Sequence, residues 1–187
     1  MKNIIPLVFA ISYSVALPAQ GVFQNQTNGI LEKVIQDYPN QFKNIKGDLL
    51  VSSAQVIEYK SVVSIPGAIA ATVTQYDSNN KKLMSWQSTV FSSTEFEDAR
   101  TKFKEIFGQI KNTIVKIEGE RPVILNGQYE TPAEQKNTTI LFDLLPATAS
   151  TKEMKVGLVL EKIQTEWKIV LSVYDKDRHA TEPLAAN

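Results

Sequence analysis

Two segments with helical periodicity, each followed by segments with a period of two, constrain the fold of this chain more than any other feature. Apolar side chains recur at the 3.6-residue period over residues 30–38, and Pro39 ends that pattern. A second helical pattern runs over residues 96–110, and Ser92 and Glu95 are spaced as a capping box ahead of it. Each pattern predicts an amphipathic helix that packs one face on a sheet.

The period changes to two after each helical segment, which predicts strands. The first helix is followed by three predicted strands, at residues 56–65, 68–76 and 83–91. The second is followed by three or four, at residues 122–125, 138–145, 154–161 and 166–174. Asn126-Gly127 predicts one hairpin turn, and residues 162–165 predict another. The order α-β3-α-β3/4 is that of an α+β fold, with two helices packed on a mostly antiparallel sheet.

The two halves of the chain resemble each other in this order. Each has a helix followed by a meander whose last strand carries a tryptophan, Trp86 in the first half and Trp167 in the second. This pattern fits an α-β-β-β duplication. The alternative is that both tryptophans are simply strand-forming residues with a large contribution to the core.

The N-terminus has the layout of a secretory signal peptide. Lys2 precedes an apolar run over residues 4–17, and small residues follow. We expect residues 1–19 to be removed, with cleavage after Ala16 or Ala19. The run is shorter than the roughly 20 apolar residues of a spanning helix, so a retained membrane anchor is the weaker alternative. The prediction is a periplasmic or secreted protein with no membrane anchor in its mature form.

Composition indicates a single domain after this leader. The 187 residues include no cysteine, which excludes disulfides, thiolate metal ligands and a lipid-acceptor cysteine. The 20 basic and 20 acidic residues balance, so the charge does not suggest a nucleic-acid partner. We expect a flexible N-terminus over residues 20–28, one α+β domain over residues 29–175, and a frayed tail over residues 176–187.

No residue pattern indicates catalysis. The one histidine, His179, falls in the predicted tail, so a Ser-His-acid triad is not expected. Glycine-rich phosphate loops are absent from the sequence, and the acidic residues around Glu95 fit the first turn of a helix. We therefore predict no catalytic residue, no metal site and no cofactor.

Aromatic residues near strand ends are the candidates for ligand binding. They are Tyr59, Tyr76 and Tyr174. The resulting hypothesis is an exported, soluble, small binding or interaction protein whose unknown partner is a protein or a small molecule. The alternative is a carboxylate-based enzyme acting on an envelope polymer or peptide, which would need two carboxyl groups about 5 to 9.5 Å apart in one pocket.

Overall fold

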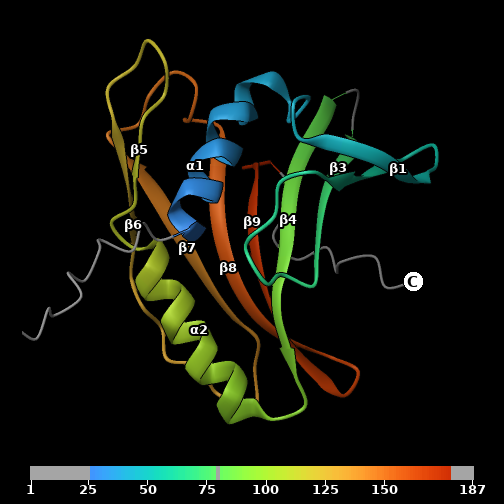
Figure 1. The fold of residues 1–187 in the computed structure, drawn as a ribbon, viewed down its shortest axis with the longest axis vertical. Coiled ribbons are helices and arrows are strands. Elements are labelled where there is room, and N and C mark those ends of the chain that lie inside the picture. The colour runs from blue at the N-terminus through green and yellow to red at the C-terminus, as the bar shows by residue number, and fades with distance from the viewer. Residues whose placement is uncertain (1–25, 79–80, 178–187) are drawn as a thin grey trace, which may run out of the picture.

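The protein folds into one antiparallel sheet with both helices on the same side. The computed structural model describes residues 26–78 and 81–177, and the sheet that these residues form has nine strands in the order β1-β2-β3-β4-β9-β8-β7-β6-β5. Figure 1 shows α1 and α2 lying in front of the curved sheet. The α+β class is therefore confirmed, with four strands between the helices and five after them. The predicted signal peptide and His179 lie outside the described residues.

The helices occupy the predicted regions: α2 has the predicted bounds, and α1 begins four residues before the predicted pattern. The helical elements are α1 (Gln26–Asp37), the 3-10 helix η1 (Tyr38–Asn40) and α2 (Phe96–Ile110). Residues 26–28, which the sequence suggested to be a flexible N-terminus, form the first turn of α1.

The predicted capping box at α2 is wrong. Glu95 is the N-cap and makes no side-chain capping bond. Ser92 belongs to the preceding strand, which continues to Ser93, and its hydroxyl donates to the carboxylate of Glu166 at 2.9 Å. Ser92 therefore pairs with β9 as part of a strand and is not at the helix terminus, where a capping box requires it.

The first half contributes one strand more than its sequence pattern predicts. Its strands are β1 (Lys46–Ser52), β2 (Val56–Ser61), β3 (Ala70–Ser78) and β4 (Lys81–Ser93). β1 is the additional strand, and its register against β2 shifts twice. Such bulges disturb the two-residue alternation by which strands are recognised, and they protect an edge strand from further pairing.

The second half adds a short edge strand and corrects one turn. Its strands are β5 (Ile114–Val115), β6 (Val123–Gly127), β7 (Thr138–Leu145), β8 (Met154–Ile163) and β9 (Glu166–Asp175). The β8–β9 hairpin is confirmed. The hairpin predicted at Asn126-Gly127 is wrong, because both residues lie in β6 and pair with β7. Gly127 is required there because a Cβ atom would lie 2.6 Å from the ring of Phe142.

The core lies between the helices and the sheet. β4 and β9 pair at the centre, and the two tryptophans of these strands, Trp86 and Trp167, are buried. The indole N–H of Trp86 donates to the hydroxyl of Ser61 at 3.1 Å and to the carbonyl of Val63 at 3.2 Å. We call the side of the sheet that carries the helices the helix side, and the opposite side the outer side.

Candidate functional site

The three tyrosines predicted to bind a ligand lie on opposite sides of the sheet. Tyr59 pairs with the core residue Val73, so its ring is on the helix side. Tyr76 and Tyr174 lie on the outer side, because Val73 and Val173, each an odd number of positions away, face the core. The structure therefore does not bring the three residues into one site.

Tyr174 packs as part of the outer side rather than projecting from it. It is only 6% exposed, and its ring lies over Gly157 on the neighbouring strand. Its Cε1 atom is 3.4 Å from the position that a Cβ of Gly157 would take. An aromatic ring that covers a strand glycine stabilises the sheet, so the packing of Tyr174 has a structural explanation.

A continuous exposed apolar surface lies on the outer side of β5, β6 and β7. Ile114 pairs with Ile124, and Ile124 pairs with Leu145, so the three side chains are direct cross-strand neighbours. Their exposed fractions are 56%, 42% and 49%. Directly opposed side chains in a sheet are about 5 Å apart at Cβ, so these residues form a continuous surface, which we call the outer row.

Polar groups border the outer row. Asp143 lies two positions from Leu145 on β7, and Lys155 on β8 forms an ion pair with it at 3.4 Å. Beyond this pair lies a further exposed apolar side chain, Leu141, at 45% exposure. An apolar centre with a charged rim is the usual anatomy of a protein-binding surface.

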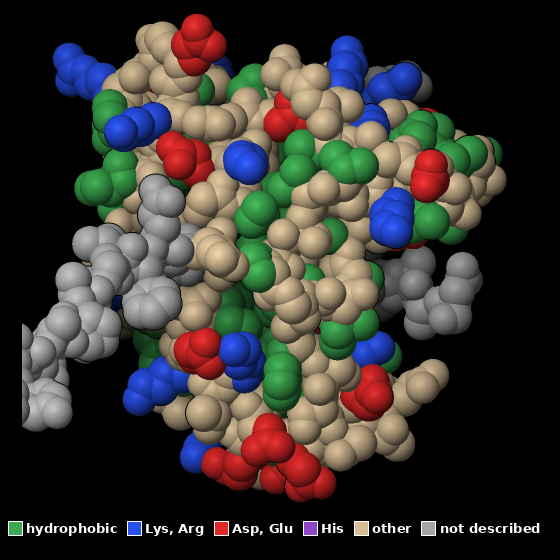
Figure 2. Space-filling model, in the orientation of Figure 1, with side chains coloured by type: hydrophobic (Ala, Val, Ile, Leu, Met, Phe, Trp, Pro, Cys, Tyr) green, Lys and Arg blue, Asp and Glu red, His purple; other side chains and the backbone are tan. Residues whose placement is uncertain are grey.

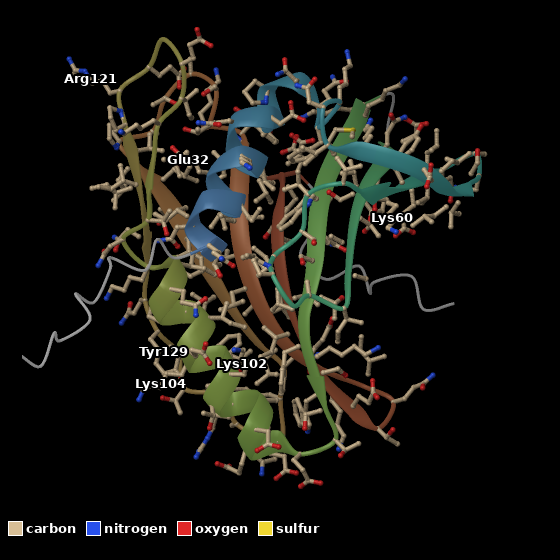
Figure 3. The ribbon with its side chains drawn as sticks, viewed as in Figure 1. Glu32, Lys60, Lys102, Lys104, Arg121 and Tyr129 are labelled. Carbon is tan, nitrogen blue, oxygen red and sulfur yellow. The ribbon has the colours of Figure 1, made fainter. Side chains whose placement is uncertain are left out.

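Side chains of α1 bind the backbone at the sheet edge next to the outer row. The carboxylate of Glu32 accepts a hydrogen bond from the backbone N–H of Lys116 at 3.0 Å, and the Gln36 amide donates to the Lys116 carbonyl at 2.6 Å. Figure 3 labels Glu32 on the helix that makes these contacts. Because side chains of α1 occupy backbone groups just after β5, a partner of the outer row would lie on the face of the sheet rather than extend its edge.

Asp175 accepts a cluster of hydrogen bonds at the end of β9. It accepts a hydrogen bond from the Tyr38 hydroxyl and another from the backbone N–H of Met84, the latter at 2.6 Å. Burial raises the pKa of Tyr38 far above its usual range, and the hydrogen bond to Asp175 adds to the increase. With donors on both of its carboxylate oxygens, Asp175 ties η1 to the central strands.

Metal-binding groups are not assembled in the described part of the chain. Among residues 26–78 and 81–177, no cluster of three or more His, Cys, Asp or Glu side chains could hold a metal ion. Neither of the described helices is long and apolar enough to cross a membrane.

The outer row has a sequence signal that the search for aromatics missed. In β7, the buried residues Ile140, Phe142 and Leu144 alternate with Leu141 and Leu145. A strand that is apolar on both faces is normally covered on both faces, whereas the two described helices cover only the helix side. The apolar residues at exposed positions of this strand were therefore the sequence feature that could have predicted the outer row.

Comparison of the chain with protein-family models, with curated proteins and with solved structures finds no match.

Proposed function

We propose that this is an exported, soluble binding protein that holds a protein partner on its outer row. The observation that carries the proposal is the continuous exposure of Ile114, Ile124 and Leu145 on adjacent strands. Single exposed apolar residues are common on protein surfaces, whereas contiguous ones mark contact sites. The predicted leader supports a periplasmic or secreted location, where the absence of cysteine imposes no redox requirement on the fold.

The outer row is large enough for the centre of an interface but not for all of it. Complete burial of an isoleucine or leucine contributes about 1.5–3 kcal/mol, so covering each half-exposed side chain contributes about 1 kcal/mol. Association costs at least about 4 kcal/mol in lost freedom of motion. The partner must therefore add contacts along the rim, including Asp143 and Lys155, to reach the roughly 1,200 Å² of a specific interface.

We also infer that the two halves descend from one α-β-β-β unit. The strand order reads outward from the central pair as β4-β3-β2-β1 on one side and β9-β8-β7-β6-β5 on the other, which is what two paired copies of a meander would give. Trp86 and Trp167 occupy the last strand of each half.

The binding proposal is tested with two matched substitutions. Ile124→Glu places a charge in the outer row, and Ile69→Glu places the same charge at a 64% exposed isoleucine outside it. Immobilised wild-type protein, I124E and I69E are each incubated with an envelope extract of the source cells, and the retained proteins are quantified. We expect one partner to be retained by wild-type protein and I69E but reduced about tenfold or more with I124E.

Two further measurements make the result decisive. Thermal unfolding of both variants shows whether the fold is intact, and sedimentation of the wild-type protein over a concentration series shows whether the partner is a second copy of the chain. Equal retention by I124E and wild-type protein, with both folded, would exclude the outer row as the binding surface.

A further inference from the structure

A second surface with different chemistry lies at the opposite end of the sheet, on the hairpin of β1 and β2. The ammonium group of Lys46 lies 5.1 Å from the centre of the Tyr59 ring. Leu49 pairs directly with Tyr59 and is 56% exposed, so an apolar side chain adjoins the ring on the same side of the sheet. The hairpin therefore presents a positive charge beside a small aromatic and aliphatic surface.

The positive charges of two more lysines affect the pKa of Lys46. Partial burial lowers the pKa of Lys46, and the positive charges of Lys43 and Lys82 lower it further, whereas the negative charge of Asp37 opposes them. Lys43 lies in the turn just before β1, and Lys82 is the second residue of β4. Figure 2 shows several Lys or Arg side chains close together at the upper right, where Figure 1 has the start of β4 and β1.

The described carboxylates near this group do not form ion pairs with its lysines. Asp37 is 6% exposed, and its oxygens accept hydrogen bonds from the Asn40 side chain, the Asn44 backbone and the Asn44 side chain. Asp77 pairs with Lys82 in the strand register, but the two side chains do not form an ion pair. Among the described residues, Lys43, Lys46 and Lys82 have no carboxylate oxygen within 4.0 Å, in contrast to Lys81, which pairs with Asp177.

The structure assigns to Lys43, Lys46, Lys82, Tyr59 and Leu49 a binding site for a phosphate group that is attached to an apolar moiety. Lysine binds phosphate as a compact point charge, and the three ammonium groups carry more positive charge than is needed to offset the two negative charges of a phosphate monoester dianion. Tyr59 and Leu49 offer the apolar part of such a ligand a surface to lie on. We call these five residues the lysine–tyrosine site.

This site is independent of the proposed function. It lies on the helix side at the β1 end, whereas the outer row lies on the outer side at the β5 end of the same sheet. It includes one of the three tyrosines expected from the sequence, Tyr59, and the reason for its role is the ammonium group of Lys46 over its ring rather than its position near a strand end.

The test measures binding of two phosphate sources to the whole chain. Phenyl phosphate represents a soluble ligand, and vesicles of phosphatidylcholine mixed with phosphatidylglycerol represent a lipid headgroup, with vesicles of phosphatidylcholine alone as the control surface. Binding of phenyl phosphate is followed by chemical-shift changes of the β1 and β2 amides, and vesicle binding by co-sedimentation. We expect saturable binding of at least one source, weakened by added salt.

Three variants locate the binding. Lys46→Gln should weaken it about fivefold, which is the effect of removing one lysine near an anionic surface. Lys46→Arg should retain most of it. Lys104→Gln makes the same change of charge at an exposed residue of α2, which Figure 3 labels far from the hairpin, and should leave binding unchanged.

The outcomes separate the possible results. Shift changes with phenyl phosphate and no vesicle binding identify a soluble ligand, and phosphatidylglycerol-dependent sedimentation identifies a lipid headgroup. Absence of binding to both probes, or equal weakening by K46Q and K104Q, overturns the site. I124E should bind both probes as wild-type protein does, so a failure of the outer-row proposal does not affect this result.

Discussion

Replacing Gly127 with alanine should destabilise the protein because the methyl group has no room. Gly127 lies in β6 opposite Phe142, and a Cβ atom at this position would be 2.6 Å from Cδ1 and 2.8 Å from Cε1 of that ring. The ring cannot move out to solvent, since Phe142 is 0% exposed and stacks on Phe107 with ring centres 5.7 Å apart. The methyl group can be accommodated only if the ring and its neighbours shift together.

The expected cost follows from this overlap. Inserting a methyl group into a packed core without space costs about 1–3 kcal/mol. For a chain of this length, each 1 kcal/mol lowers the midpoint of thermal unfolding by about 2–4 °C. We therefore expect G127A to unfold about 4–8 °C below the wild-type protein, for a loss near 2 kcal/mol.

The control is the same substitution where space is available. Gly108 lies inside α2, is exposed, and has no neighbouring atom within 4 Å of the place that an alanine methyl group would take. G108A should raise stability by about 0.5–1 kcal/mol, because alanine loses less conformational freedom than glycine on entering a helix.

The assay is urea unfolding followed by tryptophan fluorescence, together with thermal unfolding. Phe142→Leu removes the ring, so adding G127A to that variant should cost much less than adding it to the wild-type protein. A neutral or stabilising G127A, or the same cost in both backgrounds, would refute the assignment of Gly127 to the close approach of Phe142.

The remaining predictions concern buried polar groups. Tyr38 has a raised pKa in the folded state and an ordinary value near 10 when unfolded, so the wild-type protein should lose stability above about pH 10 more steeply than Tyr38→Phe; equal slopes in urea titrations between about pH 8 and about pH 11 would contradict this. Burial raises the pKa of Glu161 above 4.5, against the opposing charge of Lys168, so its ionised form destabilises the fold. Glu161→Gln should therefore raise the unfolding midpoint at about pH 7 and have no effect at about pH 3, where the residue is protonated in both states. Trp86→Phe leaves the Val63 carbonyl without its indole donor and should cost about 1–2 kcal/mol in thermal unfolding, which an unchanged midpoint would disprove.

Local patterns in the sequence predicted the long helices and strands, and they failed where contacts between residues far apart in the sequence determine the structure. The spacing of Phe103, Phe107 and Ile110 in α2 and the alternation in β8 and β9 are repeated over many residues, so the helix and the hairpin were recognised. β5 has two residues and β1 is bulged, and neither length nor alternation marks them. Asn126-Gly127 favours a turn locally, which led to the wrong prediction, whereas the glycine serves a ring that lies fifteen positions later in the sequence.

The candidate sites also depend on contacts between residues far apart in the sequence. Tyr59 was selected for its place near a strand end. The lysine over its ring, Lys46, comes from β1, and the lysines whose charges act on Lys46 come from a turn and the start of β4, so sequence spacing does not bring these segments together. The outer row depends on which face of the sheet the helices leave open, and this is a property of topology rather than of any one strand.

The pairing of β4 with β9 determines the order in which the fold can be completed. Ser85 pairs with Tyr174 and Ser93 with Trp167, so the centre of the sheet joins residues from the middle of the sequence to residues near its end. Pairings between such distant residues form slowly, because the closure of a long loop precedes the gain from contact. Until β9 is made, the edge of β4 that it occupies is unpaired and can pair with other chains. β9, the last strand of the described residues, therefore covers an edge through which growing chains can associate with one another.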